Sequence, residues 1–479
     1  MTRQTSRRRT ITGIALVGGV AAIGAGAWGV QQWAPFATTA AEVTWPDNVQ
    51  PLAEFVEATT HQHFQQPISI EFIGDAQEYA ARVHEEVTPP TVAELSDDSV
   101  EEGVGRALGL WEGDISLQAI RAAYDDSAPF PATWLTDEHT IVVNAKNGSA
   151  ELSPLLRSEV ALLLTQALDD QLFHTVEKAH AAATSQDYQV VVALGLGHAV
   201  WVHDLYVDRL SSDDLDEYYS EYDDQITEFS DAMADVPASY RAIRSVSQQI
   251  GPMFIEVLTE ENKRLVQAAF TTDLPAALDQ ISLPAGKYLR RDELEPVAAP
   301  PGPSAADVRF SNQVGPFALY LLLSTGMPDT QALIAADGWG NDRYTAYLLG
   351  DRVCVDVHLV ADSRDDAGRM ENALNGWAQA RPKAANALVA REGTDLYASA
   401  CDPGPDARQE VPGDEAINHY VARAQEIQQR VDASGNPVLA ECVAVEFFSR
   451  HSFDEAITDD SFDYFGEFDS IEQDCLDSL

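Results

Sequence analysis

The chain has 479 residues, of which 45% are apolar, so it can bury one large or two medium hydrophobic cores, and general disorder is excluded. It carries 77 acidic residues against 30 basic residues, and its formal net charge is −47. Such a polyanion is repelled by nucleic-acid phosphates, so nucleic-acid binding is excluded. We interpret the acidic excess as a strongly solvated surface, and a salt-rich or cell-surface setting is the alternative.

The N-terminal segment has the pattern of a single-pass membrane anchor. Several arginines precede an uncharged run from Thr10 to Val30, about 20 residues that can span the hydrocarbon core as a helix. Positive charges before the run, and Trp28 and Trp33 at its far end, predict a cytoplasmic N-terminus and an extracytoplasmic remainder. Cleavage as a signal peptide near residues 38–40 stays open. The expected segments are a cytoplasmic basic segment (1–10), a transmembrane anchor (11–33), and a tether with a surface helix (34–66).

Residues 67–292 are predicted to form one mostly helical domain with a small sheet. Residues 68–73 alternate apolar with smaller or polar side chains, which is typical of a strand, and residues 133–144 favour a hairpin. Two stretches, 155–173 and 187–210, have long apolar helical patterns. We expect these two stretches to be the core helices of the domain.

Two further helices are expected in this domain. Residues 213–235 interleave many acidic residues with apolar ones at three- and four-residue intervals, which predicts an amphipathic helix with an acidic, solvated outer face. Residues 239–270 predict a helix that is interrupted near Gly251 and Pro252, because proline removes a helical hydrogen bond.

The C-terminal part divides at a proline-rich segment. Residues 293–307 predict a linker or exposed loop, and residues 308–405 predict a smaller α+β sub-domain with a hairpin across Gly350 and Asp351. Residues 406–479 predict an acidic helical extension and a tail. We expect the tail, from residue 453, to be ordered only where a cysteine ties it down.

All four cysteines lie in the last third of the chain. Their number is even, and the compartment inferred from the N-terminus is oxidising, so two disulfides are expected. Four cysteines allow three pairings. We predict the sequential one, Cys354 with Cys401 and Cys442 with Cys475.

Residues 161–171 read Ala-Leu-Leu-Leu-Thr-Gln-Ala-Leu-Asp-Asp-Gln. This line resembles the active-site helix of a family of exported, largely actinobacterial, zincin-like HExxH metallopeptidases, where a line such as A-H-E-L-T-H-A-L-Q-D-Q supplies two His zinc ligands and a Glu base. Other passages similar to the family follow in its order between Ile68 and Ala380: Arg106–Leu110, Thr140–Val143, Pro284–Leu289 and Gly338–Tyr344. The resemblance implies a mostly α-helical α+β fold with a zincin-like core and a small sheet.

The chemistry of that family is replaced in this chain. Leu162 and Gln166 stand at the two His positions, and Leu163 stands at the position of the Glu base. The family's third ligand lies in a line like A-L-x-E-G-D-A, which residues 193–199 match with Leu196 at the ligand position. A catalytic zinc needs about three His or carboxylate ligands and an open position for water. We therefore expect no catalytic residue, no bound metal and no cofactor.

Loss of the metal leaves a space that must be filled, because a dry void forfeits packing. We expect Leu162 and Leu196 to approach each other there, with Gln166 bonded to a neighbouring polar group. If a cleft persists, Thr165 and His198 should line it. His198 and His203 are five residues apart and point about 140° away from each other on a helix, so they are poor co-ligands.

The sequence thus predicts a membrane-anchored, extracytoplasmic pseudopeptidase, a catalytically inactive metallopeptidase-like scaffold for binding or envelope assembly. Its expected partners are the membrane, through the N-terminal helix, and an unidentified envelope protein or peptide. Two alternatives stay open. One is an active metallopeptidase or hydrolase with a displaced site, for which His61 and His63 are near enough to bind a metal. The other is an acidic surface spacer protein.

Overall fold

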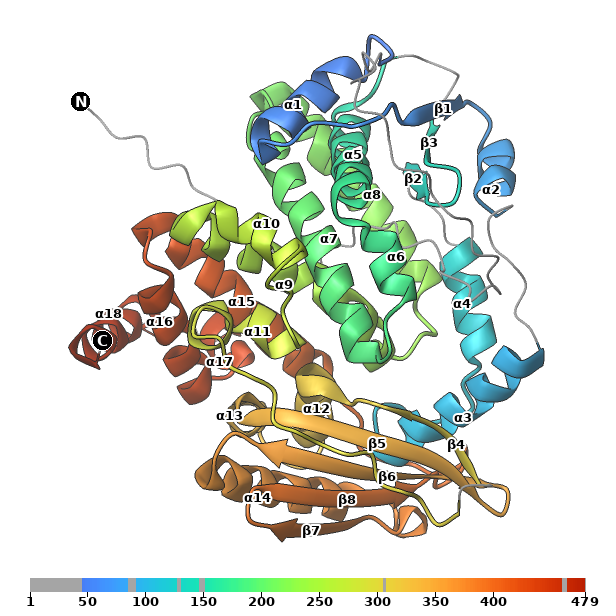
Figure 1. Ribbon diagram of the computed structural model, residues 1–479, viewed down its shortest axis with the longest axis vertical. Coiled ribbons are helices and arrows are strands. Elements are labelled where there is room, and N and C mark those ends of the chain that lie inside the picture. Colours follow the sequence, from blue (N-terminus) through green and yellow to red (C-terminus); the bar gives the residue numbers. More distant parts are fainter. Residues whose placement is uncertain are drawn as a thin grey trace.

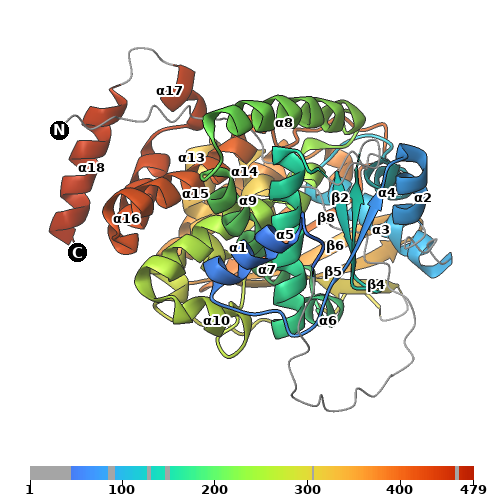
Figure 2. The same cartoon turned by 90° about the horizontal axis from the view of Figure 1, so that it is seen from above.

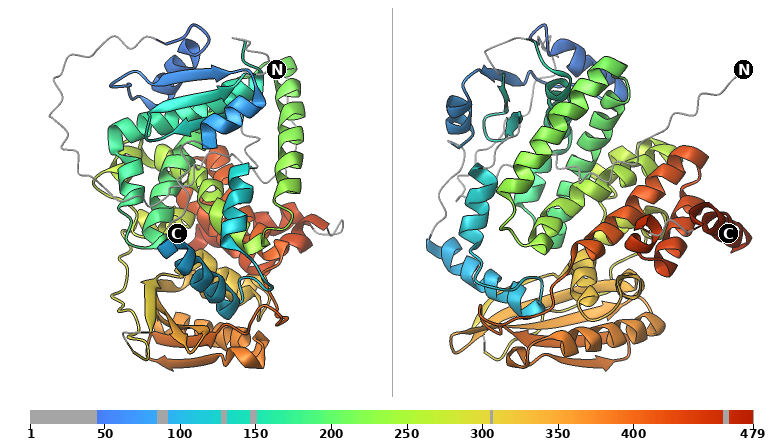
Figure 3. Two further views of the ribbon diagram at one scale, coloured as in Figure 1. Left: turned by 90° about the vertical axis from the view of Figure 1, so that its right-hand side faces the viewer. Right: turned by 180° about the vertical axis from the view of Figure 1, so that it is seen from behind.

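The computed structural model describes residues 45–84, 92–126, 131–145, 151–304, 307–458 and 463–478. The predicted cytoplasmic segment and membrane anchor lie outside these residues. The described chain is an α+β protein in which helices predominate over two small sheets, as expected. The sheets lie at opposite ends of the molecule with helices between them (Figures 1 and 3).

The end of the molecule drawn at the top of Figure 1 is built from the first part of the chain. Its sheet has the order β1-β3-β2, with β1 parallel and β2 antiparallel to β3, so the predicted strand and hairpin are confirmed. The elements formed by this part of the chain are α1 (Gln50–Thr60), β1 (Ser69–Ile73), α2 (Ala76–His84), α3 (Val92–Leu108), α4 (Leu117–Asp126), β2 (Ala132–Leu135), β3 (Thr140–Asn144), α5 (Pro154–Phe173), α6 (Thr175–His180), α7 (Ser185–Val207) and α8 (Ser212–Ala232). Of these, α3 lies at the other end, against the five-stranded sheet.

A second group of helices joins the two ends. It comprises α9 (Ala238–Asn262), α10 (Arg264–Phe270), α11 (Leu278–Ser282) and a single π-helical turn, η2 (Pro284–Tyr288). The expected interruption near Gly251 and Pro252 is wrong, because α9 runs through both residues and ends only at Asn262. α9 packs against α7 on one side and α15 on another, and this burial holds the helix together despite its proline.

The five-stranded sheet at the other end is antiparallel throughout, in the order β4-β5-β6-β8-β7. The predicted hairpin across Gly350 and Asp351 joins its two longest strands. Its elements are β4 (Val308–Asn312), α12 (Gly315–Ser324), α13 (Asp329–Asp337), β5 (Trp339–Leu349), β6 (Arg352–Ala361), α14 (Arg364–Ala380), a 3-10 turn η3 (Lys383–Ala385), β7 (Leu388–Glu392) and β8 (Asp395–Cys401).

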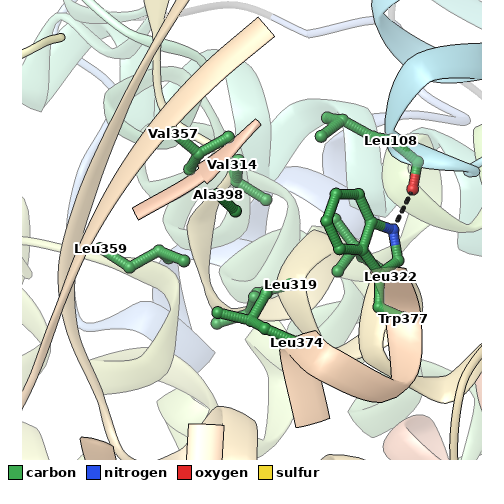
Figure 4. Close-up of a pocket in the computed structure, with 9 residues that line it drawn as sticks. All are labelled: Leu108, Val314, Leu319, Leu322, Val357, Leu359, Leu374, Trp377 and Ala398. Carbon is green, nitrogen blue, oxygen red and sulfur yellow. Dashed lines mark hydrogen bonds between the residues drawn. The ribbon is translucent and has the colours of Figure 1, made fainter. Parts of the chain in front are cut away.

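One face of this sheet is covered by helices from distant parts of the chain. Side chains of α3, α12, α14, β6 and β8 meet around an apolar cavity of about 10 Å³ (Figure 4). Its lining residues are Leu108, Val314, Leu319, Leu322, Val357, Leu359, Leu374, Trp377 and Ala398. A cavity of this size holds no more than about one water molecule, so it is a packing defect rather than a ligand site.

The proline-rich segment lies along the opposite face of the same sheet. The side chain of Asn341 donates to the Glu295 carbonyl at 2.7 Å, and that of Thr345 donates to the Pro300 carbonyl at 2.5 Å. His358 on β6 pairs with the Ala298 carbonyl at 3.1 Å. This segment is therefore bound to the sheet rather than a free linker.

The last helices pack beside α9 and extend to the periphery (Figure 2). They are α15 (Asp414–Ser434), α16 (Pro437–Arg450), α17 (Phe453–Thr458) and α18 (Tyr464–Ser478). The tail expected to be ordered only near Cys475 thus forms two helices. A single hydrophobic cluster runs from α3, α7 and α9 through the five-stranded sheet to α15 and α16, so parts of the expected segments 67–292, 308–405 and 406–479 share one core. A second cluster holds α1, most of α5 and residues of the three-stranded sheet.

Both predicted disulfides are confirmed, with the predicted pairing. Cys354 and Cys401 face each other on the neighbouring strands β6 and β8. Cys442 and Cys475 tie α16 to α18. These four are all the cysteines of the chain, and none is free.

Candidate functional site

The helix α5 forms where the sequence predicts it and is enclosed on nearly all sides. The side chain of Ser153 caps its start by accepting from Leu156 N at 3.3 Å, and Pro154 occupies the first turn. The helix ends where His174 adopts a left-handed conformation. Most of its residues are buried, which is the environment expected of a helix that is apolar all round.

Leu162 and Leu163 fill the core beneath the small sheet. Both side chains are 0% exposed, and both belong to an apolar cluster with Trp134 of β2 and Ile141 of β3. All four residues of β2 are buried as well. At these positions the described chain therefore presents packed hydrocarbon, where hydrolysis would need polar groups and water.

Three further positions expected near the site, Thr165, Gln166 and Leu196, do not line a cleft either. The Thr165 hydroxyl is buried and donates to the Ala161 carbonyl at 2.9 Å within the helix, so it faces no cleft. The expectation for Gln166 is wrong, because its Nε2 is buried and has no hydrogen-bond partner among the described residues. Leu196 is 8% exposed and lies outside the apolar cluster that holds Leu162.

The packing of α5 against α7 explains why the predicted positions do not meet. Asp169 on α5 bonds to His198 on α7, whereas Glu159, earlier on α5, interacts electrostatically with His203, later on α7. The two helices are therefore antiparallel. At a rise of about 1.5 Å per residue, these two pairs place Leu196 roughly 6–13 Å from Leu162 along the helix axes. The expected contact between these two leucines is wrong, because Leu196 lies outside the apolar cluster that holds Leu162.

One buried carboxylate–imidazole pair crosses this interface. Nδ1 of His198 on α7 lies 2.9 and 3.0 Å from the two carboxylate oxygens of Asp169 on α5. Burial raises the pKa of Asp169, and the neighbouring His198 partly offsets that rise. The His198 ring packs against Trp201 and Phe270, with centroids 6.0 and 5.8 Å away. His198 is thus a packed side chain held by a carboxylate, not the wall of a cleft.

A second imidazole–carboxylate contact, between His203 and Asp204, lies within α7, and its carboxylate side chain is exposed. Nδ1 of His203 lies 3.0 Å from Asp204 Oδ1, while its Nε2 is buried without a hydrogen-bond partner among the described residues. Burial opposes the protonated ring, but the hydrogen bond to Asp204 and the charges of Asp204 and Glu159 outweigh burial and raise the pKa of His203. Burial also raises the pKa of Glu159, and His203 lowers it in part.

Sequence reasoning missed Glu159 and Asp169. The available signal was a pair of carboxylates inside an otherwise apolar buried helix, because such groups require partners. Within the described residues no group of three or more His, Cys, Asp or Glu side chains could hold a metal ion. His61 and His63, the pair suggested for a displaced metal site, are not part of such a group either. The His63 side chain is exposed, and its Nδ1 lies 3.4 Å from Glu57 Oε2.

One described helix, α7, is long and apolar enough to cross a membrane. It is mostly buried inside the protein and contacts both α5 and α9, so its apolar character serves the core. No family model matches the chain, and no curated protein or solved structure shows significant similarity to it. The resemblance to metallopeptidases therefore rests on the sequence passages given above.

Proposed function

We propose that the protein is a membrane-anchored, extracytoplasmic pseudopeptidase, a metallopeptidase-like scaffold that binds an envelope protein or peptide without hydrolysing it. The observation that carries this proposal is the complete burial of Leu162 and Leu163 beneath β2 and β3. Hydrolysis of a peptide bond needs an activated water and groups that stabilise charge. Leucine side chains supply neither, and they exclude water from the place where the resemblance puts the chemistry.

The location outside the cytoplasm has separate support. Two disulfides join cysteines that lie far apart in the sequence, and such bonds persist in oxidising compartments. The basic and apolar pattern of residues 1–33 predicts the same orientation. A soluble domain held at the membrane by one helix suits a binding or assembly role.

A binding scaffold differs from a spacer because it has a specific contact face. Site-specific photo-crosslinking in intact cells can separate the two, with the reactive group placed at three exposed positions on different elements: Leu388 on β7, Asp224 on α8 and Asp137 in the β2–β3 turn. The scaffold predicts a discrete adduct from one face, recovered again when the identified partner carries the tag. Absence of adducts from all three positions, or equal nonspecific labelling at all three, would favour the spacer.

A further inference from the structure

Strand β7 is a free edge of the five-stranded sheet (Figure 1). The strand order places β7 last, next to β8, and no other described strand pairs with it. Four of its five residues are exposed, and only Val389 is half-buried. An unpaired edge strand presents a row of backbone donors and acceptors, so the ligand that it fits is another extended chain.

The register of the β7–β8 hairpin shows which backbone groups are free. Glu392 pairs with Asp395 across a two-residue turn, so this pair exchanges backbone hydrogen bonds. Hydrogen-bonded pairs alternate with non-hydrogen-bonded pairs along antiparallel strands. The backbone N–H and C=O groups of Val389 and Arg391 therefore point away from β8, toward the open side of the sheet. An added strand can pair with both residues.

Exposed apolar side chains border this edge on the face of the sheet away from α14. Val389 packs against the hydrophobic cluster beneath the sheet, so its neighbour Leu388 points to the other face, where it is 68% exposed. Leu388 lies opposite Ser399, two residues from Tyr397, so Leu388 and Tyr397 share that face. Tyr397 is 43% exposed, and its ring stacks on His358 at 4.7 Å. The proline-rich segment bonds to β5 and β6 and leaves this part of β7 and β8 uncovered.

The edge is locally neutral in a strongly acidic protein. The stretch Arg364–Cys401, which forms α14, β7 and β8, has five basic and five acidic residues, whereas the whole chain carries −47. The one charged side chain that flanks the free backbone groups, Arg391, is paired with Glu371 of α14 at 2.9 Å. A second copy of the chain would be repelled by its equal net charge, and basic segments are attracted to acidic faces such as that of α8. The occupant that fits β7 is therefore an uncharged extended segment.

We propose that β7 binds an uncharged, extended segment of the partner protein as a further strand of the sheet, with an apolar side chain of that segment packed on Leu388. This inference rests on the proposed function, because it names the face through which the scaffold holds its partner. Strand addition uses backbone groups, so the partner is recognised by its extended conformation and by alternate side chains. In the crosslinking experiment above, the adduct should form from Leu388 and not from Asp224 or Asp137.

The test begins with a phage-displayed library of random heptapeptides, selected on the full-length protein in detergent micelles. Enriched peptides should be uncharged, with apolar residues at every second position. A synthetic copy of one enriched peptide is then titrated by fluorescence anisotropy. Methylation of single backbone nitrogens should weaken binding by about tenfold or more at alternate positions and little at the positions between, because every second N–H of an added strand faces β7.

A substitution in β7 tests the same contact from the protein side. Val389→Pro removes a free N–H of the edge but keeps the hydrogen bonds between β7 and β8, so it should weaken peptide binding by about tenfold or more. Val389→Ala is the matched control, because it loses the same side-chain packing but keeps the N–H, and it should bind like the wild type. Thermal melts establish that both variants fold. The methylation scan uses the wild type and decides the matter if Val389→Pro does not fold.

Equal binding by the wild type and Val389→Pro would overturn the proposal, as would a methylation scan without alternation or a selection that enriches no peptide. Selected peptides that stay intact but bind elsewhere would leave the proposed function standing. Cleavage of those peptides by the protein would instead contradict the proposed function, whichever surface holds them. A wild type that sediments as a dimer, with the dimer lost in Val389→Pro, would also overturn the proposal, because a second copy would then occupy the edge.

Discussion

Glu256 lies on α9 beside a second carboxylate, that of Asp432 on α15. The pKa of Glu256 is raised to about 7: burial raises it most, the hydrogen bond from Trp201 lowers it in part, and Asp432 and Glu260 also raise it. A carboxyl whose pKa is higher in the folded state stabilises the fold below its ordinary pKa, and this contribution is lost as the pH rises through about 7. The contact between α9 and α15 should therefore weaken between pH 5 and pH 8.

Glu256→Gln should remove that part of the pH dependence. Glutamine can still accept from Trp201 and can donate to Asp432 without carrying a charge. We expect the free energy of unfolding of the variant to exceed that of the wild type by about 1–2 kcal/mol at pH 8, after allowance for solvent screening of this half-buried group. At pH 5 the two free energies should be equal. Denaturant unfolding at the two pH values measures this, with Glu261→Gln, an exposed position near the end of the same helix, as the control. If the free energy of unfolding depended on pH equally in the wild type and in Glu256→Gln, the raised pKa of Glu256 would not be the cause.

For individual residues, the sequence predicted the disulfide cysteines and the buried leucines of α5, but it did not predict which buried polar side chains bond to each other. The inferred compartment and an even number of cysteines predicted two disulfides, and the sequential choice among the three possible pairings gave Cys354–Cys401 and Cys442–Cys475. The partnership of Asp169 with His198 depends on how far α5 slides along α7, and helical periodicity within each segment contains no information about that register. For the same reason, the sequence match placed Leu196 beside Leu162, whereas Leu196 lies outside the apolar cluster that holds Leu162.

The pairing of α7 with α9 depends on a close approach of two backbones. A Cβ added to Gly197 would lie 2.5 Å from the carbonyl carbon of Gly251 and 2.6 Å from its Cα. Both neighbours are backbone atoms, so the helices would have to separate. The continuity of α9 through Pro252 escaped prediction because local propensity disfavours proline in a helix, whereas this packing outweighs a cost of about 3 kcal/mol.

Gly197→Ala should therefore destabilise the protein by about 1–3 kcal/mol or more. Gly195→Ala is the matched control on the same helix, two residues away, because an added Cβ there meets nothing within 4 Å. The control should be neutral or slightly stabilising, since alanine has the higher helix propensity. Thermal melts of the two variants provide the comparison. Similar losses in both would show that helix α7 does not lie against α9 as described.

Across the described residues, the expected segments after residue 67 pack against one another and are not separate units. Helix α3, from the first part of the chain, covers the five-stranded sheet formed mainly after residue 308. The proline-rich segment that looked like a boundary is bonded along the other face of that sheet. Composition marks where a chain is polar or rich in proline, but it does not show which surface such a segment covers. Fold class was therefore predictable, and domain independence was not.

We propose that this chain does not hydrolyse peptides, because leucines fill its core where the resemblance to metallopeptidases places the zinc site. The most direct measurement is digestion of a peptide library by the purified full-length protein, with mass spectrometry of the products, in the presence of zinc and after chelation. We predict no new cleavage sites in either condition. Chelator-sensitive cleavage at defined sites, absent from a mock purification lacking the protein, would contradict the claim.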